Sequence, residues 1–262
     1  MKMKHFLMMS LVALVAVTMT SCLHVKVGDK DWSIGGHVNT TPTQVEQVGQ
    51  DVVMNPFEDL EVNGPFNVIL EQGESHSVRV EGTAEQLGKM TIYVEDGELV
   101  IDERKNEPNS TFDGMRIFVT SPTLNDIELS GSGSITAPKA LDVNSLNVDL
   151  AGSGKVTVAE LKCKGLDIEV AGSGEVTMGL VQADVVLNEI AGSGDIDIAG
   201  LTCRKVHNEI AGSGDITLSN LNVEDVKSEI AGSGDVILRG KVGTHQETIA
   251  GSGKVDVSGL TK

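Results

Sequence analysis

Two series of carboxylates recur at a fixed spacing in the second half of the chain and are the strongest candidates for a binding site. The first series precedes a repeated Gly-Ser-Gly triplet and comprises Glu169, Glu189, Glu209 and Glu229. The second series follows the triplet directly and comprises Glu175, Asp195, Asp215 and Asp235. Carboxylates stacked about 5 Å apart repel each other, and Ca²⁺, which prefers oxygen ligands, would offset that repulsion. The alternative, which we favour, is a solvated acidic rim that discourages pairing of sheet edges.

No other residue pattern indicates catalysis, so the sequence predicts a protein that is not an enzyme. The histidines after residue 21 are scattered, and none lies beside a Ser or Cys in a nucleophile motif: they are His24, His37, His76, His207 and His245. A polysaccharide-active enzyme remains an alternative, but the repeats hold only Arg204 and Arg239 as arginines and offer no aromatic platform for a sugar. Identical carboxylates also give no reason for their pKa values to separate into acid and base roles.

The first 22 residues resemble a bacterial lipoprotein signal. Lys2 and Lys4 precede an apolar run from Phe6 to Val17, and small residues then lead to Cys22. This pattern predicts a signal peptide over residues 1–21 and a lipid attached to Cys22, with residues 22–55 as a tether. An ordinary signal peptide that happens to contain a Cys is the alternative.

A repeat of about 20 residues must position the carboxylates. The Gly-Ser-Gly triplet begins at Gly131, Gly152, Gly172, Gly192, Gly212, Gly232 and Gly251. Within each repeat, apolar residues are two positions apart, which is the period of a half-buried strand. Twenty residues are too few for a strand, a helix and a return strand. We therefore expect a parallel β-helix in which two or three strands of three to five residues make each turn, and like residues stack along the axis.

Several inward positions can be assigned from this register. Asn188, Asn208 and Ser228 should form a buried polar ladder. Cys163 and Cys203 should lie two turns apart, or about 9–10 Å, which is too far for a disulfide, so we expect two free, buried thiols. No histidine takes an inward position in the central repeats, which argues against a metal site in the lumen.

Residues 56–130 continue the strand alternation less regularly and hold all but one of the aromatic residues after residue 21. We expect them to form an irregular N-terminal β cap on the repeats of residues 131–262, in one domain over 56–262. A separate small β-domain is the alternative.

The charge balance limits the partners. With 20 Lys+Arg against 38 Asp+Glu, the formal net charge is −18, which argues against nucleic acid and leaves the lipid at Cys22 as the expected contact with a membrane.

The order of these elements resembles the bacterial head GIN domain family of auto-transporter adhesins. The similarity lies in FEDLEVNGPFNVILEQGE, DGELVID and RIFVTSPTLNDIELSGSGSI, followed by the GSG turns. It implies an all-β fold, a single-stranded right-handed parallel β-helix, and no catalytic motif or cofactor. We expect a non-enzymatic cell-envelope protein, lipid-anchored in the outer membrane, that binds polysaccharide or another envelope protein. A structural or stress-response module inside the envelope is the alternative. The sequence specifies neither the membrane face nor the oligomeric state.

Overall fold

The computed structural model of the chain describes residues 25–27, 30–32, 48–104 and 111–261. The chain divides into two compact units, Met1–Thr41 and Pro42–Lys262. In the first unit, β1 (Val25–Val27) pairs antiparallel with β2 (Lys30–Trp32). Cys22 and the expected signal peptide lie outside the described residues. The only helix described, α1 (Ala84–Gly88), is far too short to cross a membrane.

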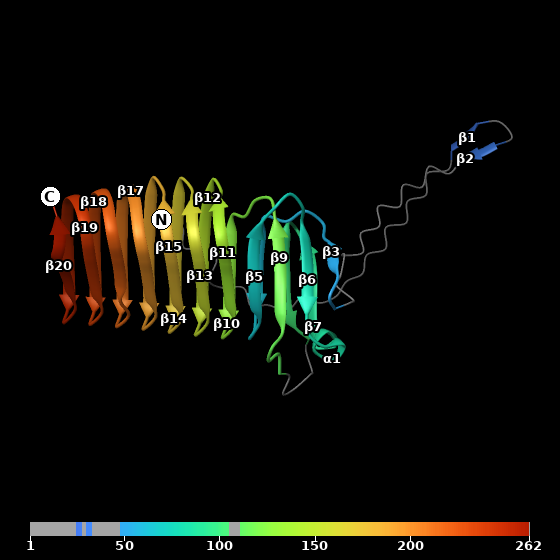
Figure 1. The fold of residues 1–262 in the computed structure, drawn as a ribbon, viewed down its shortest axis with the longest axis horizontal. Helices are drawn as coiled ribbons and strands as arrows, with labels where there is room; N and C mark the ends of the chain where they lie inside the picture. Colours follow the sequence, from blue (N-terminus) through green and yellow to red (C-terminus); the bar gives the residue numbers. More distant parts are fainter. Residues whose placement is uncertain (1–24, 28–29, 33–47, 105–110, 262) are drawn as a thin grey trace. The chain divides into compact units, whose positions relative to one another are not determined.

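The second unit is the predicted β-solenoid (Figure 1). Its regular part consists of parallel strands that follow one another along the axis. They are β10 (Asp126–Gly131), β11 (Ser134–Asp142), β12 (Ser145–Gly152), β13 (Lys155–Lys162), β14 (Gly165–Gly172), β15 (Glu175–Gln182), β16 (Val185–Gly192), β17 (Asp195–Gly212), β18 (Ile216–Gly232), β19 (Asp235–Gly251) and β20 (Lys254–Thr261). Even-numbered strands from β10 to β16 form one row, and odd-numbered strands from β11 to β15 form the other.

The strands are longer than the three to five residues expected from the sequence. Six of the strands from β12 to β20 have eight residues, and β17, β18 and β19 have 17 or 18 because each runs around a corner without losing its pairing. The register confirms the predicted columns, since Ile190, Ile210 and Ile230 are partners on successive turns. Equivalent side chains therefore stack at the strand spacing of about 4.8 Å.

The Gly-Ser-Gly triplets form one corner of every turn. The first glycine of each triplet has positive φ, as in Gly212 at 149°. Successive corners lie backbone on backbone, and the Ser213 amide donates a 2.8 Å hydrogen bond to the Gly192 carbonyl one turn earlier. A Cβ on Gly212 would overlap that same carbonyl oxygen. The repeated triplet is thus a structural corner, as its sequence predicts.

The N-terminal part of the solenoid does not follow chain order. It contains β3 (Asp51–Val53), β4 (Asp59–Asn63), β5 (Asn67–Gln72), β6 (Ser77–Glu81), β7 (Met90–Glu95), β8 (Glu98–Glu103) and β9 (Arg116–Ser121). The β10 strand stacks on β4, and β11 stacks on β5, while β8 and β9 lie on the far side of β4 and β5. The chain therefore forms β4 and β5 before β8 and β9, which lie beyond them at the end of the solenoid, and then returns past β4 and β5 to continue as β10 and β11.

Antiparallel strands and aromatic residues close this end. The β6 strand pairs with β9 and β3, and β7 pairs with β8. Phe57, Phe66 and Phe112 are buried here, with the rings of Phe66 and Phe112 edge to face at 4.7 Å. An N-terminal cap built from bulky residues is what the sequence predicts.

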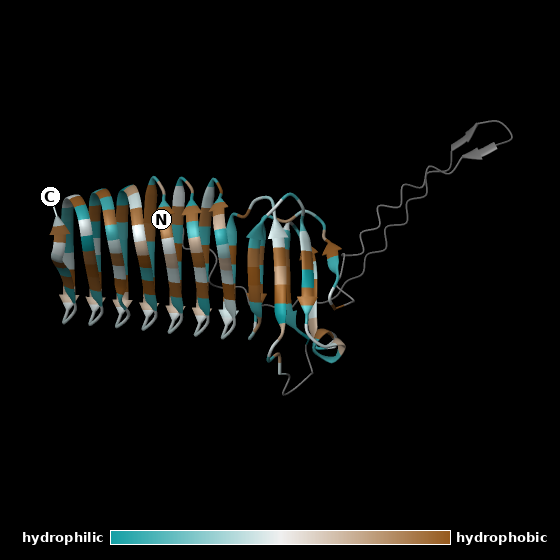
Figure 2. Ribbon diagram, viewed as in Figure 1, coloured by the Kyte–Doolittle hydropathy of each residue, from teal (hydrophilic) through white to brown (hydrophobic). Residues whose placement is uncertain are grey.

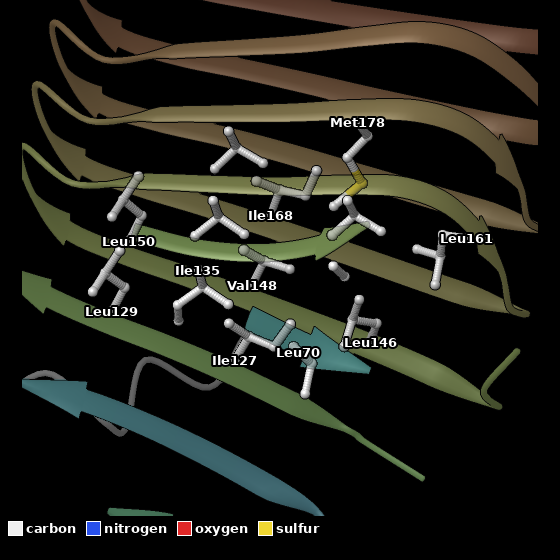
Figure 3. Packing of buried hydrophobic residues seen from close by; sticks show 14 of the residues in the cluster. Leu70, Ile127, Leu129, Ile135, Leu146, Val148, Leu150, Leu161, Ile168 and Met178 are labelled. Carbon is white, nitrogen blue, oxygen red and sulfur yellow. The ribbon is translucent and has the colours of Figure 1, made fainter. Parts of the chain in front are cut away.

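The lumen between the two rows is filled by aliphatic side chains. Along most strands of the regular part, brown residues alternate with teal or white ones, as expected when one face is buried (Figure 2). Ile127, Val148 and Ile168 form one inward column, and Leu129 and Leu150 begin the next (Figure 3). All five are at most 1% exposed, so the core is continuous from turn to turn.

One inward column changes from apolar to polar, as the sequence predicts. Asn188, Asn208 and Ser228 continue the column of Ile168 and are at most 1% exposed. The Asn188 amide donates to Asn208 Oδ1 at 2.8 Å, and the Asn208 amide donates to Ser228 Oγ at 3.3 Å. The three side chains thus form a hydrogen-bonded ladder across two turn spacings, with Asn188 Oδ1 at its end left without a partner in the described part of the chain.

Replacing Asn208 with leucine is expected to lower the free energy of unfolding by about 1–3 kcal/mol, since it leaves the Asn188 amide buried without an acceptor. Replacing Asn188 and Asn208 with leucine and Ser228 with alanine together should recover much of that loss, because no polar group is then left alone. Urea unfolding of both variants checks this. A triple variant that is less stable than Asn208→Leu would show that the ladder does not act as a unit.

The two thiols are free, but they are not equally buried. Cys203 is 7% exposed, whereas Cys163 is only half-buried because it lies just beyond the end of β13, beside a corner. Burial raises the pKa of Cys163 to about 11 and that of Cys203 to about 12. Both thiols are therefore protonated at neutral pH and behave as small hydrophobes.

Candidate functional site

The first carboxylate series forms a column on the outside of the solenoid. Glu169, Glu189, Glu209 and Glu229 are register partners on β14, β16, β17 and β18. The first three side chains are exposed, and Glu229 is half-buried. The predicted position on successive turns and the outward orientation are both confirmed.

The same column continues toward the N-terminus through Glu61, Glu128 and Asp149. The repeat pattern does not single out Glu61 and Glu128, because their neighbours depart from the AGSG consensus, and Asp149, which precedes a complete AGSG, has Asp where the later repeats have Glu. The sequence nevertheless contains a feature that identifies them, since each of the three lies three residues before a glycine. In the structure that glycine has positive φ, as in the repeats. The column therefore has seven acidic members and not four.

A second outward column runs beside the first, two residues earlier on each strand. Its acidic part comprises Glu98, Asp59, Asp126 and Asp167, with Asn147 between the last two. Leu187, His207 and Lys227 then follow in register. We call the seven-membered column and these four acids the acidic face. Its second column thus changes from acidic to basic along the axis.

Crowding raises the pKa of several carboxyls on the acidic face. Burial, with Asp126, Glu169, Glu128 and Asp167 nearby, raises the pKa of Asp149 to about 7. Burial, with Glu61 as the strongest of four acidic neighbours, also raises the pKa of Glu98 to about 7. Glu229 differs, since hydrogen bonds from Lys227 and His207 lower its pKa. Hence part of this face is protonated near neutrality.

These shifts correct one expectation. The repeat predicts that the stacked carboxylates have similar pKa values. In the structure their neighbours and their burial differ from turn to turn, so their pKa values differ as well. Asp149 and Glu229 belong to one column, yet their pKa values shift in opposite directions. Equivalence of the acids is therefore no argument against catalysis.

The second carboxylate series has a structural task. Each Oδ1 of Asp195, Asp215 and Asp235 accepts a hydrogen bond from the backbone amide one turn later, at 3.0, 2.8 and 3.1 Å. Glu175 instead forms an ion pair with Lys155 at 2.7 Å. These carboxylates cap the strands that leave the Gly-Ser-Gly corner. In the part of the chain that the structure describes, no hydrogen bond or ion pair links them to the acidic face.

Among the described residues, His207, Glu209 and Glu229 form a group whose side chains could together bind a metal ion. One ligand atom from each lies within 4.8 Å of the others. His207 Nε2 is 2.9 Å from Glu229 Oε2, and Lys227 Nζ is 2.7 Å from the same oxygen. His207 lies outside the repeated pattern and points outward, so the repeat alone does not place it beside the two predicted carboxylates. A shallow groove lined by Leu187, Lys205 and His207, among others, adjoins the group.

Solved structures share this fold at low sequence identity. A "putative adhesin" from Bacteroides fragilis matches with a TM-score of 0.71 at 23% identity, covering 79% of this chain and 94% of that one. A "putative lipid binding protein" from Parabacteroides distasonis matches with a TM-score of 0.68 at 23% identity, covering 86% and 98%. A "putative adhesin" from Parabacteroides merdae gives 0.59 at 18% identity, covering 86% and 98%.

No curated protein sequence matches the chain. One family model does match, over residues 56–220 and again over 189–262, and together these ranges span the cap and all of the repeats. The chain therefore belongs to the family described as "Putative auto-transporter adhesin, head GIN domain".

Proposed function

We propose that this protein is a non-enzymatic binding scaffold of the cell envelope, anchored through a lipid on Cys22, whose solenoid presents a repetitive outer surface. The observation that carries the proposal is the unbroken register of outward side chains. A column of seven acids on stacked parallel strands can offer one contact repeatedly to a repetitive partner. Several weak contacts along a rigid surface together give a much higher overall affinity than one contact alone.

The adhesin description of the family and the names of two similar structures support a binding role. The acidic face favours partners that are cationic, or acidic polysaccharides bridged by divalent cations. A module inside the envelope without an external ligand is the alternative, as is a polysaccharide-active enzyme.

Replacing Cys22 with alanine tests the anchor. The wild-type chain should be found in the membrane fraction and incorporate labelled palmitate, whereas Cys22→Ala should lose the label and leave that fraction. Cys203→Ala is the control and should change neither result. Retention of label by Cys22→Ala would contradict the lipid site.

Protease treatment of intact cells then distinguishes the scaffold from the internal module. Cleavage in intact cells places the solenoid on the surface, and cleavage only after lysis supports the module. A glycan array read with and without EDTA tests the polysaccharide, and shortened glycan products would show an enzyme.

A divalent-cation site is a second candidate function, favoured by the convergence of His207, Glu209 and Glu229. The acidic series alone suggests Ca²⁺, but an imidazole nitrogen beside two carboxylates shifts the preference toward Zn²⁺. Two of the ligands are on β17 and one is on β18, so the backbone holds them on neighbouring rungs. Lys227 competes for Glu229, and a bound ion would have to displace its ammonium group.

The metal hypothesis therefore makes an unusual prediction about Lys227. Replacing Lys227 with methionine should tighten Zn²⁺ binding by about two- to fivefold, because the exposed ion pair that it removes is worth up to about 1 kcal/mol. His207→Ala should abolish the binding heat in calorimetry, and Glu224→Gln, an exposed acid elsewhere, should leave it unchanged. Weaker binding by Lys227→Met, or no heat from Zn²⁺ with the wild type, would contradict the site.

A further inference from the structure

The last turn of the solenoid exposes positions that are buried in every earlier turn. Ile249 continues the column of Ile190, Ile210 and Ile230, which are at most 2% exposed, but it is itself 38% exposed. Val257 on β20 is 41% exposed. Val255 and Leu260 are only partly buried against the core. The cross-section of the core is thus open at this end.

The backbone at this end is also unpaired. The β20 strand pairs with β19, and residues Thr244–Gly251 of β19 pair with β18. Among residues 48–104 and 111–261, no strand pairs with the outer edge of either. Free N–H and C=O groups beside apolar side chains form a template for another strand. At the opposite end the outer edges of β3 and β7 also lack a partner among the described residues, but antiparallel strands and buried phenylalanines close the core there.

Two polar residues of the last turn give the open edge a self-complementary chemistry. His245 and Glu247 replace the inward Val226 and Ser228 of the preceding turn. His245 Nε2 is buried and has no hydrogen-bond partner within the described part of the chain, and Glu247 is exposed. In an antiparallel pair of two β19 edges centred on Gln246, each His245 would lie opposite the Glu247 of the other copy. Residues opposite one another in such a pair have Cβ atoms about 5 Å apart.

The charges of the last turn permit this approach. Between residues 239 and 261, Arg239, Lys241 and Lys254 stand against Glu247 and Asp256, in a chain whose formal net charge is −18. Arg239 also pairs with Asp256 at 3.5 Å. This end therefore carries less of the negative charge that would make the acidic faces of two copies repel each other.

We propose that two copies of the chain associate through these C-terminal edges, end to end, about a two-fold axis that passes near Gln246. The contact extends the β-structure of one solenoid into the other, buries Ile249 and Val257, and pairs His245 with Glu247 twice. Because the same surface serves both copies, the assembly closes at two and does not grow into a filament. This interface is independent of the surface proposed for binding.

Sedimentation of the full chain, with Cys22→Ser to exclude association through lipid, tests the proposal. The chain that carries only Cys22→Ser should sediment as a dimer, with twice the chain mass of 27.6 kDa, at micromolar concentration. Glu247→His and His245→Glu should each weaken the dimer at least about tenfold, because each places like groups opposite one another. The double variant with both changes should restore the dimer, since complementary groups then face each other again, and a variant that had merely unfolded would not.

Leu180→Glu is the matched control, because Leu180 is an apolar side chain that is 61% exposed on the side of the solenoid. This variant should remain dimeric. A wild-type monomer at all concentrations would overturn the proposal. A dimer that survives both single charge changes, or one that Leu180→Glu disrupts, would also overturn it.

Discussion

Gly212→Ala is expected to destabilise the solenoid strongly, although it adds only one methyl group. Gly212 has φ 149°, which side chains of L-residues rarely adopt, and its new Cβ would overlap the Gly192 carbonyl oxygen. A strained backbone and an overpacked contact each cost about 1–3 kcal/mol, so we expect a loss of about 2–6 kcal/mol in the free energy of unfolding.

The neighbouring Ser213 supplies the control for this corner. Its side chain is exposed, and only its backbone amide bonds to the previous turn. Ser213→Ala should therefore stay within about 0.5 kcal/mol of the wild type in the same urea titration. Equal stability of Gly212→Ala and Ser213→Ala would mean that successive corners are not stacked backbone on backbone.

The acidic face should make the protein more stable in mild acid than at alkaline pH. The pKa of Asp149 rises from 3.8 when unperturbed to about 7, and that of Glu98 from 4.5 to about 7. Between about pH 4 and pH 7 the folded state then binds more protons than the unfolded state, so the free energy of unfolding falls as the pH rises through this window. Solvent screening reduces the effect, but a shift of about 1 kcal/mol corresponds to about 2–4 °C for a domain of this size. We therefore expect a Tm at pH 5.5 that exceeds the Tm at pH 8.0 by at least that much.

Asp149→Asn should raise the Tm at pH 8.0, change it little at pH 5.5, and so flatten the profile. Glu175→Gln is the opposing control, because hydrogen bonds from Lys155 and Thr177 lower the pKa of Glu175. That carboxylate stabilises the fold when ionised, so its loss should lower the Tm at pH 8.0. A Tm for the wild type that rises from pH 5.5 to pH 8.0 would contradict the crowding of the acidic face.

The repeats were predictable because their information is local and repeated. The two-residue alternation and the 20-residue period together determine which side chains point inward and which stack, down to the ladder of Asn188, Asn208 and Ser228. Strand lengths were less predictable. Strand pairing can continue or stop at a corner depending on how the backbone bends there, and that bend does not alter the hydrophobic pattern. The passage of the chain over β4 and β5 could not be predicted, because it depends on pairing between strands about 67 residues apart in sequence.

The candidate site was predictable only in part, for a related reason. The positions of the eight predicted acids followed from the repeat, but their environments did not. Asp195, Asp215 and Asp235 accept backbone amides of the next turn, which no spacing reveals. The column of His207 changes from Leu187 to His207 to Lys227 on successive turns. His207 therefore lies beside the groove and contacts Glu229, although no repeated residue marks its position. A repeat that is recognised by identical residues does not reveal a column in which the residue type changes from turn to turn.

Distances between spin labels on the Gly-Ser-Gly corners test the stacking of turns most directly. Ser153, Ser233 and Ser252 are exposed corner residues. The corner of Ser233 lies four turns after that of Ser153, and the corner of Ser252 lies five turns after it. With Cys163 and Cys203 replaced by alanine and the labelled chain diluted in unlabelled chain, the Ser153–Ser233 pair should give a narrow distribution near 19 Å, at about 4.8 Å per turn. The Ser153–Ser252 pair should lie about 5 Å farther apart. Broad distributions, or separations that do not grow with the number of turns, would contradict a solenoid whose side chains stack in columns.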